Sequence, residues 1–392
     1  MPHVVMVDLD DWRSFATMGA ALRRRGVRVS RVARRRGGLR ASLRELLDRV
    51  VLGEWPVLLG VDEVTDPSRV LSAVLAASPD DVHASEGFMA AAFTASGPTG
   101  SDLVGRVPDE GLRAILYDKL LMTRHAEGLG LSVPLTWSAP PEGQFPVMVK
   151  GRSGAGGLSV RVATDAATLE AAVEELAREG WEEVFFQEVC PGRLVNVGGV
   201  ARDGQVIVSV SYAATPRADD PLGPPEWLEV VDVPRLCDEL GRLVESLGYS
   251  GLFCVDYMVD DGDHDGDARL AMIDVNSRAF GAWLALQLAG ADILGAYLSI
   301  LGVEGEPAGT TIAAGTAVDC RMLPRLGQSD LSSVAREGRR AGRAIAESLD
   351  AVGARLVAVM AVQASILVGA EAGRVVVSRL ASAIAPIGGR RR

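Results

Sequence analysis

A lysine that is followed closely by four glycines is the first feature of the sequence that could perform chemistry. Lys150 ends a short apolar run, and glycines stand at positions 151, 154, 156 and 157. Because glycine has no Cβ, backbone N–H groups in such a turn can approach phosphate oxygens, and the ammonium group can neutralise their charge. The lysine precedes the glycines and no helix follows directly, so this is not a Walker A loop. A plain hairpin turn is the alternative interpretation.

Acidic residues within two apolar segments form the second such feature. The period-two geometry of a strand places Asp274, Asn276 and Arg278 on one face, and Asp256 lies within an earlier apolar run. Two carboxylates on buried neighbouring strands repel each other and lose hydration, which favours a cation between them. Mg²⁺ prefers one or two carboxylates together with substrate phosphates, so the pattern predicts a magnesium site. An ion pair of Arg278 with one aspartate is the alternative.

Lysine is rare in this chain, and that makes its two lysines informative. Of 40 basic residues, only Lys119 and Lys150 are lysines. An ammonium group is a compact, flexible point charge that the guanidinium fork cannot imitate, so both lysines are candidates for a role that arginine cannot fill. Two residual lysines without a common role are the alternative.

The periodicity of apolar residues predicts the elements that position these side chains. Before residue 105, predicted strands alternate with predicted helices, which indicates an N-terminal α/β domain with a parallel sheet. The predicted strands are 4–8, 27–32 and 56–59, and the predicted helices are 12–25, 38–51 and 66–77. No Gly-x-Gly-x-x-Gly motif follows the first strand, so we expect no dinucleotide site there.

The rest of the chain predicts a mixed α/β region followed by a small accessory domain. The predicted helices are 112–127, which carries Lys119, then 165–180, 234–248 and a basic helix at 332–348. The predicted strands are 147–150, 158–163, 184–189, 252–259 and 269–276, the last two forming an antiparallel hairpin. The segment 213–226 is rich in Pro, Asp and Gly and predicts a loop.

Composition excludes several classes of protein. The chain has 392 residues, of which 48% are hydrophobic and 23% charged, as in a soluble protein with two or three domains. Its net charge of −11 argues against nucleic acid as a partner. The longest apolar stretch, 356–370, is too short to span a bilayer, and the first residues leave no room for a signal peptide. We therefore expect a cytoplasmic protein with no membrane partner. Its four cysteines show no disulfide or zinc spacing.

Four segments resemble the motifs of the ATP-grasp superfamily in order and approximate spacing. They are 145–150 with the glycine loop, 186–192, 248–256 and 273–278, and the helix with Lys119 precedes them as it does in that family. The resemblance implies an α/β chain with an α+β ATP-grasp domain at 106–305, divided into a lid at about 111–188 and a core at about 189–305. The N-terminal parallel α/β domain at 1–105 and a C-terminal accessory domain at 306–392 flank it.

The same resemblance implies the residues that bind ATP. Lys119 and Lys150 would hold the α- and β-phosphates, and a loop with Ser153, Gly154, Gly156 and Gly157 would fold over the triphosphate. The hinge that binds adenine would contain Gln187, Glu188 and Cys190. An acidic residue that often contacts the ribose in the family is replaced by Leu194, so Asn196 becomes the candidate for that contact.

The metal and the reacting phosphate are assigned by the resemblance in the same way. Asp256, Asp274 and Asn276 would hold Mg²⁺, and Arg278 would face the γ-phosphate or the acyl phosphate, so Arg278 and Lys150 are the catalytic candidates. The family usually has Glu where Asp274 stands, and one methylene less would shift or weaken the metal.

The function that the resemblance implies is an ATP-dependent ligase. A carboxylate would be joined to an amine, less often a thiol, through an acyl phosphate, with release of ADP and phosphate. The expected substrates are a small carboxylate and an amine such as an amino acid or peptide, and a homodimer is compatible with the family. The glycine loop and the 213–226 loop would close as lids, and Arg217 and Arg321 are candidates for clamping a carboxylate.

Three other functions stay open. A haloacid-dehalogenase-type phosphatase or phosphotransferase would use Asp8 and Asp10, with the acidic loop 262–267 as a later motif. Biotin-dependent carboxylation uses the same fold, although the chain has no biotin-carrier motif. A catalytically inactive ATP-binding protein is the third. The acidic loop also mimics the start of an EF-hand, but Met272 stands where the bidentate Glu is needed, so we expect no calcium site.

Overall fold

The chain begins with a strand whose side chains are buried on both faces, as expected inside a parallel sheet. The computed structural model describes residues 1–9, 13–35, 56–64, 66–84, 107–154, 157–215, 227–260, 269–303, 305 and 307–319. Within them, four parallel strands pair in the order β3-β2-β1-β4. They are β1 (His3–Asp8), β2 (Arg28–Arg34), β3 (Val57–Leu59) and β4 (Asp81–Ala84). The predicted parallel sheet is confirmed, and β4 adds a strand to those predicted.

Helices connect the strands of this N-terminal sheet. The helix α1 (Arg13–Arg24) and the helix α4 (Pro67–Ala76) confirm two predicted helices, and α3 (Val61–Val64) is a single turn between β3 and α4. Asp66 caps α4, because its side chain accepts a hydrogen bond from the Ser68 amide and a proline opens the helix. The predicted helices at 38–51 and 332–348 lie outside the described residues.

A second sheet of four antiparallel strands, here called the lid sheet, has the order β5-β8-β6-β7. Its strands are β5 (Thr136–Trp137), β6 (Val147–Gly151), β7 (Val160–Ala163) and β8 (Val184–Glu188). The helix α9 (Ala166–Arg178) covers one face, where Val147, Val149 and Phe186 join its apolar cluster. Because side chains alternate along a strand, Lys150 and Gln187 belong to the opposite face, which α9 leaves uncovered although both side chains are buried. The predicted strand at 158–163 begins two residues later, at Val160.

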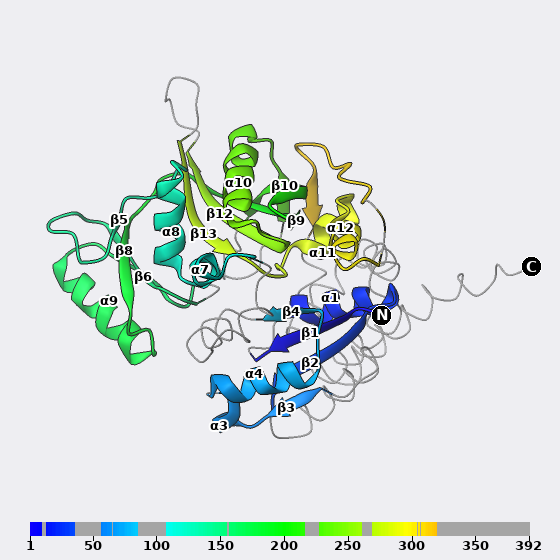
Figure 1. The fold of residues 1–392 in the computed structure, drawn as a ribbon. Helices are drawn as coiled ribbons and strands as arrows, with labels where there is room; N and C mark the ends of the chain where they lie inside the picture. Colours follow the sequence, from blue (N-terminus) through cyan, green and yellow to red (C-terminus); the bar gives the residue numbers. More distant parts are fainter. Residues whose placement is uncertain are drawn as a thin grey trace, which may run out of the picture.

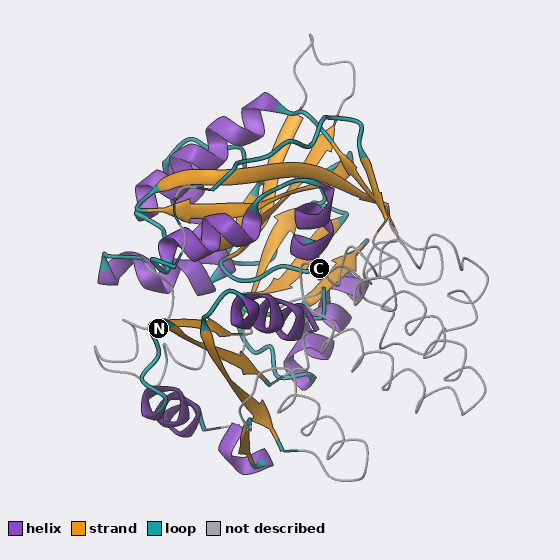
Figure 2. Ribbon diagram, turned by 90° about the vertical axis from the view of Figure 1, so that its right-hand side faces the viewer, coloured by secondary structure: helices purple, strands orange, loops and turns teal. Residues whose placement is uncertain are grey.

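A third sheet, here called the core sheet, has six antiparallel strands in the order β13-β12-β9-β10-β11-β14. They are β9 (Arg193–Arg202), β10 (Gln205–Thr215), β11 (Trp227–Val230), β12 (Gly251–Asp260), β13 (Arg269–Asn276) and β14 (Ala317–Asp319). The predicted hairpin is confirmed as β12 and β13. The helix α10 (Pro234–Leu247) packs on one face, and α11 (Trp283–Ala289) and α12 (Ile293–Ile300) pack on the other. Figure 2 shows these strands between layers of helices.

The N-terminal sheet is joined to the core sheet through one continuous apolar cluster. Phe15, Met18 and Leu22 of α1 share this cluster with Trp283 of α11 and with buried residues of α12. Figure 1 shows α1 directly beside α11 and α12, and the lid sheet on the far side of the core. Burial of apolar area therefore joins two regions that are far apart in the sequence.

The helix predicted at 112–127 is interrupted, which corrects the sequence-based prediction. The structure has α7 (Glu110–Arg113), the 3₁₀ helix η1 (Ala114–Tyr117) and α8 (Lys119–Gly128). The break lies at Asp118, which has extended backbone angles and whose carboxylate accepts hydrogen bonds from the amides of Leu120 and Leu121. An aspartate stabilises a helix start by satisfying these free N–H groups. Lys119 thus becomes the first residue of a capped helix.

One contact between helices makes stability depend on pH. His125 on α8 lies 2.9 Å from the Ser246 hydroxyl on α10, measured from Nε2, and burial lowers the pKa of the imidazole. The unfolded chain, with an ordinary histidine pKa of about 6.5, then binds the proton more readily than the folded chain. We expect this contribution to the free energy of unfolding to be full above that pH and to be lost as pH falls below it.

Urea unfolding of wild type and His125→Gln at pH 7.5 and pH 5.5 checks this expectation, with Arg124→Gln as a neighbouring non-titrating control. The stability lost between the two pH values should be smaller in His125→Gln. An equal loss in both proteins would contradict the assignment.

Candidate active site

Three polar side chains stand in one row across adjoining strands of the core sheet. Asp256 on β12 lies opposite Asp274 on β13 and opposite Asn196 on β9. The Asn196 amide donates a hydrogen bond of 2.5 Å to Oδ1 of Asp256. Antiparallel pairing places directly opposite residues close together on the same face, so the register alone brings the two carboxylates together. The predicted juxtaposition of Asp256 and Asp274 is present in the structure.

The pairing of β12 with β13 is irregular at this row. Asp256 is opposite Asp274, but the next residue, Tyr257, is opposite Met272, so Ile273 is an extra residue in β13. Such a β-bulge leaves backbone groups out of the ladder and re-aims the neighbouring side chain. The Ile273 carbonyl accepts a hydrogen bond of 3.3 Å from Nζ of Lys150, which comes from the lid sheet. The bulge in β13 therefore provides a hydrogen-bond acceptor on the core sheet for Lys150 of the lid sheet.

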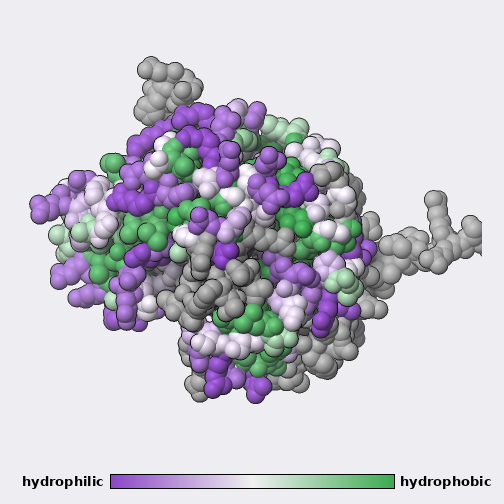
Figure 3. Space-filling model, in the orientation of Figure 1, coloured by the Kyte–Doolittle hydropathy of each residue, from purple (hydrophilic) through white to green (hydrophobic). Residues whose placement is uncertain are grey.

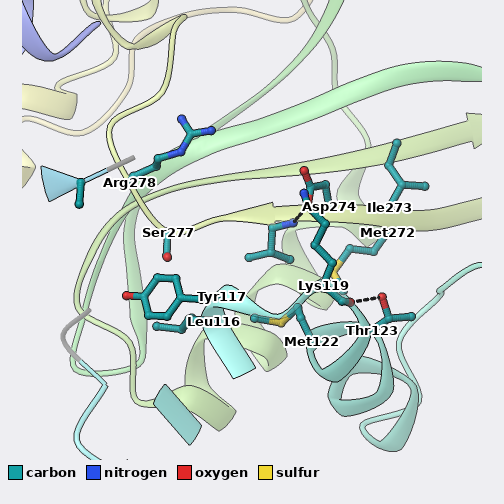
Figure 4. A pocket seen from close by; sticks show the side chains of 12 residues that line it. Leu116, Tyr117, Lys119, Met122, Thr123, Met272, Ile273, Asp274, Ser277 and Arg278 are labelled. Atoms are coloured by element: carbon teal, nitrogen blue, oxygen red, sulfur yellow. Dashed lines mark hydrogen bonds and ion pairs between the residues drawn. The ribbon is translucent and has the colours of Figure 1, made fainter. Parts of the chain in front are cut away.

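The second lysine reaches the same row from α8. Nζ of Lys119 lies 2.6 Å from Oδ1 of Asp274. Figure 4 shows the two side chains at the same end of the pocket. The capped helix start fixes this lysine, and its own backbone N–H donates to the Arg152 carbonyl at 2.8 Å. Arg152 in turn donates to the capping carboxylate of Asp118. These contacts tie the start of α8 to the chain just after Lys150, so both lysines are held beside Asp274.

Burial disfavours the charged forms of both Lys150 and Asp256. Burial lowers the pKa of Lys150 to about 8, and the charge of Asp274 opposes this shift. Burial also raises the pKa of Asp256 to about 6, and the nearby charge of Asp274 adds to it. A buried ammonium is stabilised by an anion and facing carboxylates by a cation. A divalent cation carrying phosphate oxygens supplies both, so the residues present fit such a pair.

A pocket with an empty volume of about 540 Å³ opens beside this row. Its walls come from η1, α8 and β13, with Ala84 from the end of β4. Figure 4 shows Asp274 and Lys119 at one end and Tyr117 and Ser277 at the other. Arg278 also lines the pocket, and its Nη2 donates to Oδ1 of Asn276 at 2.9 Å. Both of these side chains are buried, so Arg278 is fixed beside the candidate ligand Asn276.

The predicted hinge residues follow the last strand of the lid sheet. Gln187 is only 1% exposed; its Nε2 donates to Oγ1 of Thr136 at 3.1 Å, whereas Oε1 has no hydrogen-bond partner in the described structure. Gln187 is opposite Met148, two residues before Lys150, so it shares the uncovered face with that lysine. A buried acceptor without a partner is costly, and a ligand N–H would satisfy it.

The two other hinge candidates are held in place by protein contacts. Oε1 of Glu188 accepts from Arg269 at 2.9 Å and from the Leu135 amide at 3.1 Å. Sγ of Cys190 lies 3.9 Å from the same oxygen, and burial raises the pKa of this thiol to about 11. Glu188 therefore braces the hinge, and Cys190 is a neutral thiol rather than a nucleophile.

The lid exposes apolar side chains near these residues. Figure 3 shows hydrophobic side chains gathered over the lid sheet, with hydrophilic ones over the outer helix α9. The exposed hydrophobic residues of this region include Leu135, Leu158 and Val162. An apolar surface of this kind suits the flat face of an aromatic ring, which loses water on binding.

The glycine loop is described in part. At Gly154 the φ angle is +114°, and a Cβ there would lie 2.5 Å from Oγ of Ser159, so this position requires glycine. Gly157 also has a positive φ, of +74°. Ser153 is half-buried at the start of the loop. Glycine is therefore favoured by the backbone at both positions, and the role of the loop in phosphate binding stays a prediction.

Several predicted residues lie outside the described part of the chain. They are Asp10, Gly156, Arg217, Arg321 and the acidic loop 261–268. Asp8, the first residue of the alternative phosphatase motif, is buried and lies 3.0 Å from a guanidinium nitrogen of Arg31. None of the helices in the described residues has the length and apolar character that crossing a bilayer requires.

The comparison with protein families decides the identity of the central region. No curated protein matches the chain in sequence. A family model described as an ATP-grasp domain matches residues 116–282. These residues form an ATP-grasp domain. The match contains both lysines, the bulged hairpin and the hinge, and the resemblance drawn from the four motifs is confirmed.

Solved structures support the same fold for the ATP-grasp domain and its surroundings. A biotin carboxylase from Campylobacter jejuni superposes with a TM-score of 0.56 at 15% identity, covering 78% of this chain and 72% of that one. An L-amino acid ligase from Bacillus licheniformis gives 0.51 at 14% identity, with 78% of each chain covered. An N5-carboxyaminoimidazole synthetase from Staphylococcus aureus gives 0.57 at 12% identity, with 86% of each chain covered. At these identities the likeness concerns the fold alone.

Two contacts in the ATP-grasp domain, Asn196 with Asp256 and Thr136 with Gln187, were not predicted from the sequence. Asn196 was expected near a ribose, yet its amide contacts Asp256, so it also belongs to the carboxylate row. Period-two alternation along β9 could have placed it on that row, had the strand been recognised. Thr136, the partner of Gln187, had no signal in the sequence. Within the described residues, no three His, Cys, Asp or Glu side chains group to hold a metal, so Mg²⁺ would depend on phosphate oxygens as well.

The position of the Lys150 ammonium beside the core sheet leads to a prediction about the affinity for ATP. Lys150→Met should weaken binding of ATP about tenfold or more, because a hydrogen bond to a charged group contributes about 1.5–3 kcal/mol. Calorimetric titration with ATP and Mg²⁺ checks this. Arg161→Met on the same lid, where Arg161 contacts Glu175 and Glu179, is the matched control. Equal affinities of Lys150→Met and wild type would remove Lys150 from the site.

Proposed function

We propose that the protein is an ATP-dependent ligase that joins a carboxylate to an amine through an acyl phosphate, with release of ADP and phosphate. The observation that carries this proposal is the row of Asn196, Asp256 and Asp274, with Lys119 and Lys150 held beside it by the core and lid. Facing carboxylates together with buried ammonium groups suit a triphosphate with a divalent cation.

Different residues of the site would bind the cation, the phosphates and the adenine of the nucleotide. Asp256, Asp274 and Asn276 would hold Mg²⁺, which supplies neutralisation of phosphate charge when bound. Lys119 and Lys150 would contact the phosphates, and the loop from Ser153 onward would cover them with backbone N–H groups. The free acceptor of Gln187 would receive the amino group of adenine. The carboxylates and Asn276 lie on β12 and β13, Lys119 begins α8, and Lys150, Gln187 and the loop belong to the lid sheet.

The reaction itself needs positioning more than covalent help from the protein. An oxygen of the substrate carboxylate would attack the γ-phosphorus, and the bond from that phosphorus to ADP would break. The amine nitrogen would then attack the acyl carbon and lose a proton, and inorganic phosphate would leave. Arg278 would stabilise the charge that develops on the transferred group, because it is buried at the edge of the pocket beside Asn276.

The pocket also indicates where the other substrates would bind. One end carries Lys119 and Asp274, and Tyr117 and Ser277 lie at the other, while Ala84 also lines the pocket. Ala84, Tyr117 and Ser277 carry no formal charge. We infer a small carboxylate and an amine, such as an amino acid or peptide, at this end. A cytoplasmic location and a homodimer belong to the same proposal.

ADP formation tests the proposed reaction. Wild-type protein with ATP and Mg²⁺ should release ADP only when one carboxylate and one amine from a panel are both present, and bicarbonate should be included among the carboxylates. Asp274→Asn should lower the rate about 100-fold or more, the size expected for loss of a preorganised electrostatic contact. Asp260→Asn on the neighbouring strand is the control. ATP binding without ADP from any pair would favour an inactive ATP-binding protein.

The metal assignment gives a separate prediction. Asp256→Asn should raise the Mg²⁺ concentration for half-maximal activity about tenfold or more, because one charged contact worth about 1.5–3 kcal/mol is lost. A magnesium titration of ADP release measures this, with Asp238→Asn on the exposed face of α10 as the control. An unchanged magnesium requirement would place the cation elsewhere.

A further inference from the structure

Three polar side chains form a buried hydrogen-bonded trio where the N-terminal sheet meets the core. The hydroxyl of Tyr297 on α12 donates to Oδ2 of Asp81 at 2.5 Å, and Nε2 of His83 lies 2.7 Å from the same hydroxyl. A hydroxyl that donates to a carboxylate can still accept, so the imidazole N–H donates to Tyr297. Tyr297 is 0% exposed, Asp81 8% and His83 5%, so these bonds are shielded from water.

Both partners of Tyr297 belong to β4, a short strand of the N-terminal sheet. β4 has four residues, stands at the edge of its sheet and pairs with β1. A short edge strand is weakly fixed by its ladder alone. Asp81 and His83 share one face by alternation, and that face meets α12. The position of β4 therefore depends on contacts of its side chains.

The other face of β4 reaches the proposed active site. Val82 and Ala84 belong to the apolar cluster of the N-terminal sheet, against which Tyr117 of η1 is packed. Ala84 and Tyr117 both line the pocket, and the Ser277 hydroxyl interacts with Tyr117. Any shift of β4 would thus move one wall of the pocket end that holds neither Lys119 nor Asp274.

The apolar packing between the two regions does not fix this wall by itself. The contact of α1 with α11 and α12 is hydrophobic, and hydrophobic contact has no preferred direction. Hydrogen bonds weaken steeply when their angles change, so the trio defines the position of β4 on α12. The neighbouring rings support this geometry, since His83 and Tyr297 pack edge to face with centroids 5.1 Å apart.

We propose that Asp81, His83 and Tyr297 act as positioning residues, which fix the end of β4 against α12 and thereby set the width of the substrate end of the pocket. This inference rests on the proposed ligase function for its catalytic consequence. The nucleotide end is built from α8, β13 and the lid, so it is independent of the trio. Loosening the trio changes recognition of the carboxylate or amine and leaves the binding of ATP unchanged.

The test compares Tyr297→Phe with Tyr249→Phe, a second buried tyrosine of the core, whose hydroxyl donates to the Leu252 carbonyl at 2.6 Å. In Tyr297→Phe the KM for the carboxylate or amine should rise about three- to tenfold, as expected for loss of one or two hydrogen bonds. The Kd for ATP should stay within about twofold of wild type. His83→Gln keeps an N–H donor and should lie closer to wild type than His83→Leu.

Hydrogen–deuterium exchange separates this inference from the proposed function. In Tyr297→Phe, amides of 81–84 and 116–117 should exchange faster, while those of 147–151 in the lid should not change. Unchanged exchange at 81–84 overturns the proposal, whether or not the protein forms ADP. An equal loss of affinity for ATP and substrate also overturns it, because the trio would then be merely structural. Absence of ADP with every substrate pair overturns the ligase function instead.

Discussion

The repulsion between two facing carboxylates is the constraint on which the rest of the structure depends. Asp256 and Asp274 are opposite each other because β12 and β13 pair in one register, which holds their backbones side by side. Lys119 offsets part of the charge in the structure as described, at 2.6 Å from Asp274. Burial and the charge of Asp274 both raise the pKa of Asp256, even with Lys119 close by.

The surrounding elements can be understood from this constraint. The bulge at Ile273 gives the buried Lys150 ammonium a carbonyl partner on the core sheet, and the Asp118 cap starts α8 at the residue that must reach Asp274. The bulge at Ile273 and the cap at Asp118 are both local irregularities in otherwise regular elements. Irregularities of this kind are expected where function requires a side chain in an exact place.

Much of the site could be predicted from the sequence, because its residues lie at fixed spacing within strong apolar patterns. Alternation placed Asp274, Asn276 and Arg278 on one face, and the rarity of lysine drew attention to Lys119 and Lys150. The break at Asp118 was missed, since apolar periodicity continues through it while the cap acts locally. The strands β4, β9 and β10 were also missed, although β9 and β10 form a hairpin whose turn, Asp203 and Gly204, is a recognisable signal in the sequence. The proposed domain bounds stay predictions. The region that matches the family model, 116–282, lies inside the predicted ATP-grasp domain at 106–305.

The row of Asn196, Asp256 and Asp274 has a consequence for how the chain reaches its native state. Its members come from three strands, and β9 is separated from β13 in sequence by the strands β10, β11 and β12 and the helix α10. Contacts of such long sequence separation form late and slowly, because the intervening chain must close first. Capacity to capture a divalent cation should therefore arise only with the final pairing of the sheet, which would make metal binding a reporter of completed folding.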